Sequence, residues 1–403
     1  MSVPKVSAKN FKNEQIVFQV DRNESGEPRV LGKSNLEVYL GREFNGAGEI
    51  PYAVKIIPIP DRDVDQGKFD NLMNQVANSM SATAQISSDK YPEIKKHMMS
   101  ARACVYNSEF SAYMIEKLYS IPLYQTNQVF KTTSNFYSSC AIEPEHMYIL
   151  YELIAGEDLE KLIFKRGGID YKKYGHQLLY VLSLLHGISP PPSYLAPIVH
   201  LDIKPANIMI DTTGNLKLID TFGLCKIDNP SCRIYTGTLE YDGPEADGGR
   251  IKTAEEIAAV SAAETFAEKN SIRATFVAAL PKLSKEALSI DRQNRNKAAD
   301  VFATGITLYE MITGKKSAHL GERPDGMTFR HFWERMIVEN REIDLEFPEG
   351  TQQFKPLIQK MIRRDYMTRI SAAEALAEFS ELIKGGGRRT RRNKKSKQYI
   401  NGR

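Results

Sequence analysis

Two short apolar runs separated by a polar turn constrain this chain more than any other feature. The runs IMI (208–210) and LKLI (216–219) flank DTTGN, whose residues favour turns, so they predict a β-hairpin. Asn207 stands directly before the first run and Asp220 directly after the second, so the reversal brings an amide oxygen and a carboxylate to one end. Oxygen ligands of this kind suit Mg²⁺, and Asn207 and Asp220 are therefore candidate metal ligands.

The loop before the hairpin carries a carboxylate and an ammonium group. Asp202 lies five residues before Asn207, and Lys204 lies between them. A base and a counter-charge for phosphate would therefore lie beside the predicted metal. The alternative is that Asp202, Lys204 and Asn207 only cap the turns of an ordinary hairpin, which is a common role for such residues.

The sequence HLDIKPAN (200–207) resembles the catalytic loop of eukaryotic-type protein kinases, whose pattern is H-R-D-x-x-x-x-N. The resemblance implies that Asp202 is the catalytic base that orients the substrate hydroxyl and that Lys204 neutralises the γ-phosphoryl group. It implies Asn207 and Asp220 as the Mg²⁺ ligands. In this family, a lysine at position 204 also favours serine and threonine over tyrosine as substrates.

The strand YAVKII (52–57) resembles the kinase motif V-A-I-K, which implies that Lys55 holds the α- and β-phosphates of ATP. A glutamate from a helix would pair with Lys55. We favour Glu109, because Glu109 and Tyr113 fit a helical pattern, and Glu116 stays open as the alternative. The resemblance implies a nucleotide site that includes Gly32, Val38, Ala53, Lys55, Glu109, Glu152, Ile154 and Asp158.

The segment ILYELIAGEDL (149–159) resembles the hinge between the two kinase lobes. This implies that Tyr151 is the gatekeeper, that backbone groups of Glu152 and Ile154 bind adenine, and that Asp158 lies near the ribose. The alternative is a buried strand that leads into a capped helix.

The segment GTLEYDGPEA (237–246) resembles the G-T-x-x-Y-x-A-P-E motif that closes the kinase activation loop. The resemblance implies that Thr238 contacts Asp202 and Lys204 and belongs to the catalytic group.

Two contacts implied by the resemblance concern architecture more than chemistry. Glu245 would form a buried ion pair with Arg369 of the RRDYMTRIS run. Asp300, in a helical segment, would hold the catalytic loop from below.

The chain departs from the kinase pattern at three places. In the phosphate loop, LGKSNLEVYLG (31–41), Ser34 stands where a second glycine is expected, and the third glycine is missing. DTFG at 220–223 replaces D-F-G, with one residue more. Leu201 replaces the arginine that grips a phosphorylated activation loop in the family, so we predict activity without loop phosphorylation.

The order of strand and helix signals favours an α+β fold. The resemblance implies a bilobal protein-kinase-like fold, with a small antiparallel-sheet N-lobe and a mainly helical C-lobe. The expected divisions are an N-terminal extension (1–14), an N-lobe (15–153) with an insertion (56–108), a C-lobe (154–384) with an insertion (246–297) and a basic flexible tail (385–403).

The net charge of +4 belongs to the end of the chain. Residues 384–403 hold nine Lys or Arg and no Asp or Glu, so the rest of the chain carries −5. The tail predicts nonspecific, salt-sensitive contact with nucleic acid or an anionic surface, or a nuclear import signal, and its alternative is a solvated extension.

The four cysteines form no CxxC pair, no apolar run is long enough to span a membrane, and the N-terminus lacks a signal peptide. These features favour an intracellular protein of the cytoplasm or nucleus. The insertions and the tail give some resemblance to kinases of large DNA viruses, which would add the virion as a location.

The leading prediction is an ATP-dependent protein serine/threonine kinase that uses ATP and Mg²⁺ and acts on Ser or Thr of protein substrates. The runner-up is a pseudokinase scaffold that binds nucleotide or a partner without turnover, because the glycine loop is poor and DTFG has an extra residue. A small-molecule phosphotransferase is a third alternative, disfavoured by GTLEYDGPE and the Lys204-Pro205 pair.

Overall fold

The computed structural model divides the chain into two compact units. The first comprises Met1–Gly156, Ser189–Ile198 and Met209–Cys232, and the second comprises Glu157–Ile188, Val199–Ile208 and Arg233–Arg403. The residues that the structure describes are 6–10, 15–33, 37–45, 48–61, 63–86, 92–107, 137–140, 146–187, 197–227, 232, 238–246, 253–279, 284–316 and 329–384.

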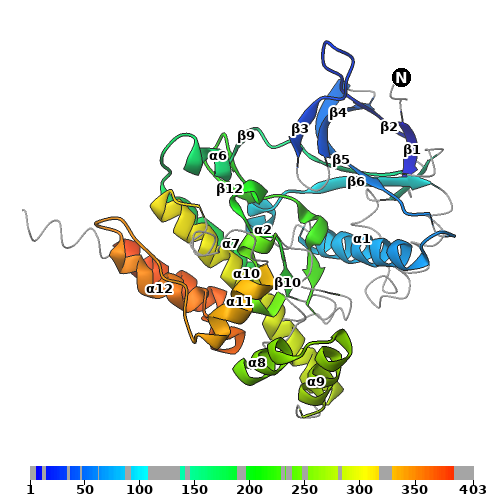
Figure 1. The fold of residues 1–403 in the computed structure, drawn as a ribbon. Helices are drawn as coiled ribbons and strands as arrows, with labels where there is room; N and C mark the ends of the chain where they lie inside the picture. The colour runs from blue at the N-terminus through cyan, green and yellow to red at the C-terminus, as the bar shows by residue number, and fades with distance from the viewer. Residues whose placement is uncertain are drawn as a thin grey trace, which may run out of the picture. The chain divides into compact units, whose positions relative to one another are not determined.

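The first unit is built on an eight-stranded sheet in the order β2-β1-β7-β6-β8-β5-β4-β3 (Figure 1). Because β2 also pairs with β4, seven of these strands close into a ring, and β3 lies outside it on β4. Neighbouring strands are antiparallel except β6 and β7, which are parallel. The strands are β1 (Val6–Asn10), β2 (Gln15–Val20), β3 (Val30–Lys33), β4 (Glu37–Asn45), β5 (Gly48–Pro58), β6 (Ala101–Asn107), β7 (Tyr137–Cys140) and β8 (His146–Glu152).

The sheet is larger than the small antiparallel sheet that the sequence predicted. Strand β1 lies within the expected extension 1–14, and β6 lies within the expected insertion 56–108. That insertion range also holds helices α1 (Gln66–Ile86) and α2 (Pro92–His97). The insertion was expected to be partly helical, and it is. The bounds of α1 were not predicted, because its buried positions include the polar residues Asn78, Ser79 and Thr83.

The predicted β-hairpin is confirmed. It consists of β11 (Ile208–Asp211) and β12 (Leu216–Leu218), and β9 (Gly156–Asp158) pairs with β11. The Asp211 carboxylate accepts hydrogen bonds from the backbone of Thr213 and Asn215, each at 2.9 Å, which fixes the turn. After β12 come the short helix η2 (Thr221–Gly223) and β13 (Cys225–Lys226), which pairs with β10 (Ile198–Val199). The sulfurs of Cys225 and Cys232 lie within disulfide-bonding distance.

The second unit is mainly helical, as the sequence predicted. Its longest helix, α10, begins after the N-cap Ser284 and ends at Gly314, which has φ 67°. Helix α10 packs against α7 and α12, and Phe302, Phe354 and Phe379 are fully buried. The helices are α6 (Leu159–Phe164), α7 (Tyr171–Gly187), α8 (Ala254–Ala262), α9 (Phe266–Ala278), α10 (Lys285–Thr313), α11 (Phe329–Val338), α12 (Lys355–Met361) and the helix of residues 372–384, with short turns η1 (Pro205–Asn207), η3 (Leu239–Tyr241), η4 (Pro244–Ala246), η5 (Gln352–Phe354) and η6 (Tyr366–Thr368).

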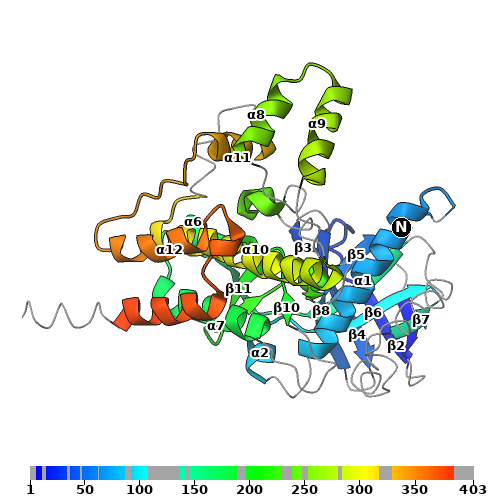
Figure 2. The same ribbon diagram turned by 90° about the horizontal axis from the view of Figure 1, so that it is seen from below.

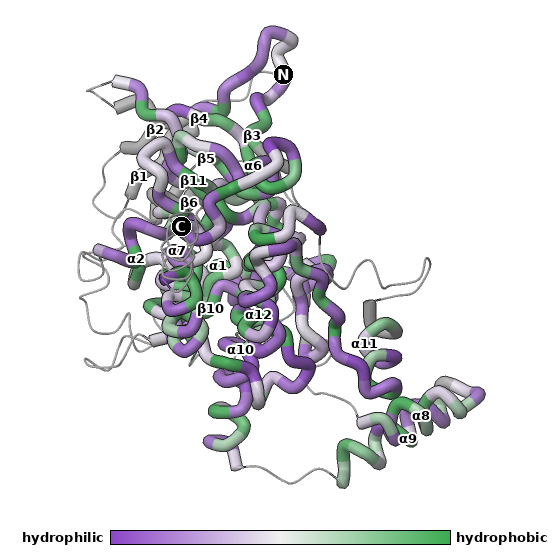
Figure 3. The backbone as a smooth tube through the Cα atoms, turned by 90° about the vertical axis from the view of Figure 1, so that its left-hand side faces the viewer, coloured by the Kyte–Doolittle hydropathy of each residue, from purple (hydrophilic) through white to green (hydrophobic). Residues whose placement is uncertain are grey.

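The expected insertion 246–297 contains a pair of helices, α8 and α9, which lie side by side (Figure 2). Thr253 and Thr265 cap their N-termini, and Glu268 completes a capping box with Thr265. Hydrophilic and hydrophobic residues are mixed along both helices (Figure 3). Within the described part of the chain, no helix has the length and apolar character needed to cross a membrane.

A buried ion pair braces the second unit. Both side chains of the Glu245–Arg369 pair are fully buried, and Arg369 Nη2 donates to Glu245 Oε2 at 2.7 Å. Arg369 also donates to the carbonyls of Arg363 at 2.6 Å and Ala298 at 3.0 Å, and its guanidinium lies 4.9 Å from the centre of the Phe302 ring. The predicted pairing is therefore confirmed, and it ties the segment 238–246 to α10 and the loop before the last helix.

Replacing Arg369 by methionine should lower the free energy of unfolding by about 3–5 kcal/mol, because Glu245 would remain buried without its partner charge. Equilibrium urea unfolding measures this loss. The matched control is Arg363→Met, since the Arg363 side chain makes an exposed hydrogen bond to the Thr368 carbonyl at 2.9 Å. The control should lose less than about 1 kcal/mol, and equal losses in the two variants would contradict a special role for the buried pair.

Candidate active site

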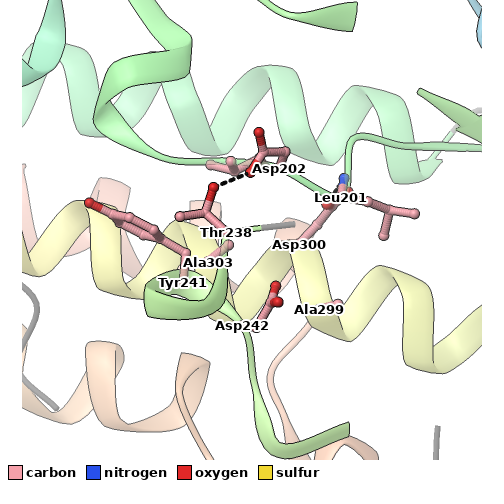
Figure 4. Close-up of a pocket in the computed structure, with 9 residues that line it drawn as sticks. Leu201, Asp202, Thr238, Tyr241, Asp242, Ala299, Asp300 and Ala303 are labelled. Atoms are coloured by element: carbon pink, nitrogen blue, oxygen red, sulfur yellow. Dashed lines mark hydrogen bonds between the residues drawn. The ribbon is translucent and has the colours of Figure 1, made fainter. Parts of the chain in front are cut away.

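Asp202, Lys204 and Thr238 of the second unit form one hydrogen-bonded cluster. Thr238 Oγ1 donates to Asp202 Oδ1 at 2.8 Å (Figure 4), and Lys204 Nζ donates to Asp202 Oδ2 at 2.9 Å. Lys204 Nζ also donates to the Thr238 hydroxyl. The predicted contacts of Thr238 are thus confirmed, and the carboxylate is held at both oxygens.

The backbone that presents Asp202 is fixed by a buried carboxylate on α10. Asp300 accepts hydrogen bonds from the backbone N–H of His200 at 2.8 Å and of Leu201 at 2.7 Å, and His186 Nε2 lies 3.0 Å from its Oδ2. Leu201 has φ 62°, a conformation that a branched side chain rarely adopts. The predicted contact of Asp300 is confirmed: it holds the loop that carries Asp202, with Leu201 in a strained conformation.

The hydrogen bonds of the Asn207 side chain are made by its amide nitrogen and not by its amide oxygen. Its Nδ2 donates to the Asp202 carbonyl at 2.9 Å and to Asp202 Oδ2 at 2.6 Å. In the described structure, the Asn207 amide oxygen makes no hydrogen bond, although the residue is buried. An amide oxygen of this kind is a suitable ligand for a hard cation.

A small cavity opens beside this cluster. Its lining includes Asp202, Thr238, Tyr241, Asp242 and Asp300 (Figure 4). Burial and the nearby negative charges of Asp202, Glu245 and Glu240 raise the pKa of Asp242 to about 8, and Lys204 opposes this shift. Asp242 is therefore largely protonated at neutral pH.

In the first unit, Lys55 and Asp220 form an ion pair. Lys55 Nζ lies 2.6 Å from Asp220 Oδ1, and Lys55 is almost completely buried on β5. Lys55 Nζ also lies 5.2 Å from the centre of the Phe222 ring. Asp220 has φ 57° and ψ 58°, so it is another non-glycine residue in the left-handed region. Strain of this kind is often found at functional sites.

The expected helix partner of Lys55, Glu109, lies outside the described residues, as does its alternative, Glu116. The helix that does contact the loop after Asp220 is α1, which packs against η2. Helix α1 contains no glutamate, and its one acidic residue is Asp70.

The remaining predicted nucleotide residues of the first unit lie on neighbouring strands. Gly32 on β3 pairs with Val38 on β4, and Val38 faces Lys55 across the β4–β5 ladder. Ala53 on β5 is paired with the gatekeeper Tyr151 on β8. The sheet therefore brings Gly32, Val38, Ala53 and Lys55 together through its register.

The residues predicted to bind adenine and ribose differ in how many of their polar groups are already hydrogen-bonded. The Glu152 N–H donates to the Ser100 carbonyl at 3.0 Å, so this N–H is not available to adenine. The backbone of Ile154 makes no hydrogen bond in the described part of the chain. In the second unit, Asp158 caps α6 by accepting from Lys161 N at 2.8 Å, and it also pairs with Lys161 Nζ at 2.6 Å. Both Asp158 oxygens are thus in use, as the capped-helix alternative expected.

The candidate metal ligand in each unit, Asp220 in the first and Asn207 in the second, suits Mg²⁺ bound together with phosphates better than a protein-only metal site. The described residues contain no group of three or more His, Cys, Asp or Glu that could hold a metal ion. Mg²⁺ in phosphate-transfer sites commonly takes one or two protein oxygens and completes its shell with phosphate and water. Asp220 and Asn207 supply oxygens of this type.

Sequence reasoning missed two residues of this region. Asp242 occupies the variable position of the G-T-x-x-Y-x-A-P-E pattern, where a charged residue was an available but unused signal. Ser79 on α1 donates to the Thr221 carbonyl, directly after Asp220, and no sequence pattern pointed to that contact.

Comparisons with known proteins agree with the geometry. The family model described as "Protein kinase domain" matches residues 122–257, about a third of the chain. The relatives include a probable serine/threonine-protein kinase, PknB, of Corynebacterium glutamicum, 26% identical over 46% of this chain and 22% of the relative. Serine/threonine protein kinase ypkA of Aspergillus fumigatus is 28% identical over 60% of this chain and 36% of the relative. Mitogen-activated protein kinase kinase 9 of Arabidopsis thaliana is 39% identical over 24% of this chain and 29% of the relative.

The matched part of the chain thus spans about a fifth to a third of the length of these relatives. None of the three supports the predicted contact of the tail with nucleic acid, and the viral resemblance remains a prediction. The α+β fold, the loop at 200–207 and these matches agree: residues 122–257 match the protein kinase domain, and the chain is similar to serine/threonine protein kinases.

Proposed function

We propose that this protein is an active serine/threonine protein kinase that transfers the γ-phosphate of ATP to a Ser or Thr hydroxyl of a protein. One observation carries the proposal: the Asp202 carboxylate accepts hydrogen bonds from Lys204, Thr238 and Asn207. The residue before it, Leu201, has a strained backbone that the buried Asp300 holds in place. A merely structural turn would not need three polar groups around one partly buried carboxylate. Such an arrangement is expected of a positioned base.

Each residue has a definite task in this proposal. Asp202 accepts a hydrogen bond from the substrate hydroxyl and orients it for in-line attack. Lys204, 2.9 Å from Asp202, neutralises charge that develops on the transferred group, and Thr238 keeps both side chains in place. When bound, Mg²⁺–ATP supplies the phosphoryl group that is transferred. The negative charge of its phosphates is attracted to the lysine side chains of the site.

The remaining tasks concern nucleotide and metal. Lys55 holds the α- and β-phosphates, and it must exchange part of its contact with Asp220 for those phosphates. Asp220 and Asn207 are the metal ligands, each through an oxygen. Gly32, Val38, Ala53, Glu152 and Ile154 surround the nucleotide.

The second candidate is a pseudokinase scaffold that binds nucleotide without turnover. The observation that favours it is the Lys55–Asp220 pair, because Lys55 here is paired with the proposed metal ligand. The extra residue Thr221 is consistent with it as well.

The deciding change is Asp202→Asn. It should reduce phosphate transfer from ATP to a Ser/Thr peptide library by about 10²–10⁴-fold, since the amide cannot act as a base, while ATP binding is retained. The control is Asp344→Asn, which makes the same chemical change at an exposed carboxylate in a surface ion pair with Lys355. If wild type binds ATP in a thermal-shift assay and transfers nothing, the scaffold function is the correct one.

Activity should not depend on phosphorylation of the activation loop. Leu201 is buried and apolar where the family uses an arginine, so it offers no charge to grip a phosphate. The variants Ser231→Ala, Tyr235→Phe and Thr236→Ala, at positions outside the described residues, should each retain most of the wild-type kcat/KM. A loss above about tenfold in one of them, restored by an acidic residue there, would contradict the prediction.

Asp242 should make stability fall as pH rises. Its pKa is about 8 in the folded protein against an ordinary value of 3.8, so folding takes up a proton between these values. The free energy of unfolding is therefore highest, as far as Asp242 is concerned, below pH 4. It falls as the pH rises to 8, by at most about 1.4 kcal/mol per pH unit.

The variant Asp242→Asn removes this dependence, so its stability advantage over wild type should grow between pH 5 and 8 and then level off. Urea unfolding at a series of pH values measures the difference. An advantage that does not change with pH would show that Asp242 is ionised in the folded protein.

A further inference from the structure

Helix α1 lies against the loop that follows Asp220. It packs against η2 and β13, the two elements that follow Asp220. Its sequence, QGKFDNLMNQVANSMSATAQI, has no glutamate, and Asp70 is near its beginning. Some other group of α1 must therefore connect the helix to the loop.

Ser79 makes that connection. Its hydroxyl donates to the Thr221 carbonyl at 2.7 Å in a buried contact, and Ser79 itself is only 4% exposed. The Thr221 carbonyl also accepts from Leu224 N at 3.2 Å within the loop. The Ser79 bond is the shorter of the two, and it joins the loop to a separate element.

The loop needs such a tie because Asp220 is held in a strained conformation. Its φ of 57° lies in the left-handed region, which aspartate adopts less readily than glycine, so contacts of the peptide that follows help to hold it there. The Thr221 side chain gives no polar help, because its buried hydroxyl has no hydrogen-bond partner in the described structure. The Thr221 carbonyl, fixed by Ser79, is adjacent to the peptide bond that sets the direction of the Asp220 carboxylate.

We propose that Ser79 is a positioning residue that aims the Asp220 carboxylate at the metal, so that α1 acts on the metal site through a backbone carbonyl. The inference rests on the proposed function only in taking Asp220 as a metal ligand. It predicts that loss of the Ser79 hydroxyl weakens the hold on the cation.

The test is the affinity of Mn²⁺ in the presence of ADP, measured by electron paramagnetic resonance on the full chain. Ser79→Ala should raise the Mn²⁺ dissociation constant about three- to tenfold, the size expected for the loss of one buried hydrogen bond. The matched control is Thr83→Val, which removes a buried hydroxyl one turn further along α1, where no hydrogen bond to Thr221 is made. Thr83→Val should leave the Mn²⁺ dissociation constant unchanged.

A Mn²⁺ dissociation constant that is unchanged in folded Ser79→Ala, or changed equally in Thr83→Val, overturns the proposal. If Ser79→Ala does not fold, Ser79→Cys replaces it, since a thiol is a weaker donor of similar size and should raise the dissociation constant by a smaller factor. An unchanged dissociation constant in Ser79→Cys then overturns the proposal.

These outcomes remain distinct from failure of the proposed function. A wild type that binds Mn²⁺ with ADP but transfers no phosphate would disprove the kinase activity, and the ratio between the variants would still decide the role of Ser79. A wild type that binds no Mn²⁺ with ADP would overturn both.

Discussion

The buried carboxylate of Asp300 is the constraint on which the catalytic loop depends. A carboxylate that is fully enclosed must be compensated by donors, and Asp300 finds them in two consecutive backbone N–H groups and the ring of His186. Both backbone donors come from the loop that precedes Asp202. Because the buried carboxylate needs both donors, the loop is held in one conformation, in which Leu201 has a φ of 62°. The direction of Asp202 follows from that conformation.

The same reasoning extends to the segment that carries Thr238. Thr238 can hold Asp202 only if its own segment is fixed, and the Glu245–Arg369 pair anchors the other end of that segment. Tyr241, between them, donates to Glu310 on α10 at 2.9 Å. Buried polar pairs therefore secure both sides of the cluster. Their value is geometric, because desolvation offsets much of what such pairs contribute to stability.

The sequence was sufficient where a short pattern fixes a local geometry. The hairpin is such a case. The Asp300 contact and the Glu245–Arg369 pair join residues far apart in sequence, and they were predicted through the family resemblance. The sequence was insufficient for the bounds of α1. This helix buries Asn78, Ser79 and Thr83, and periodicity analysis recognises helices by their apolar faces. The closing of the ring by β1 and β7 depends on pairings far apart in sequence, which no local pattern encodes. The raised pKa of Asp242 likewise depends on charges that only the fold brings together.

The described part of the chain has three non-glycine residues with positive φ. Leu201 and Asp220 adjoin the proposed chemistry, whereas Asn340 follows the end of α11. A left-handed asparagine at a helix end is common and needs no support. Leu201 and Asp220 need it, and each receives it inside its own unit: Leu201 from Asp300, and Asp220 from Lys55 on its side chain with Ser79 on the following peptide. In the proposed function phosphates engage Lys55, and the Ser79 contact still restrains the peptide that follows Asp220. The absence of a glutamate from α1 is then compatible with a working metal site, because the helix restrains the backbone next to the ligand without competing for the lysine.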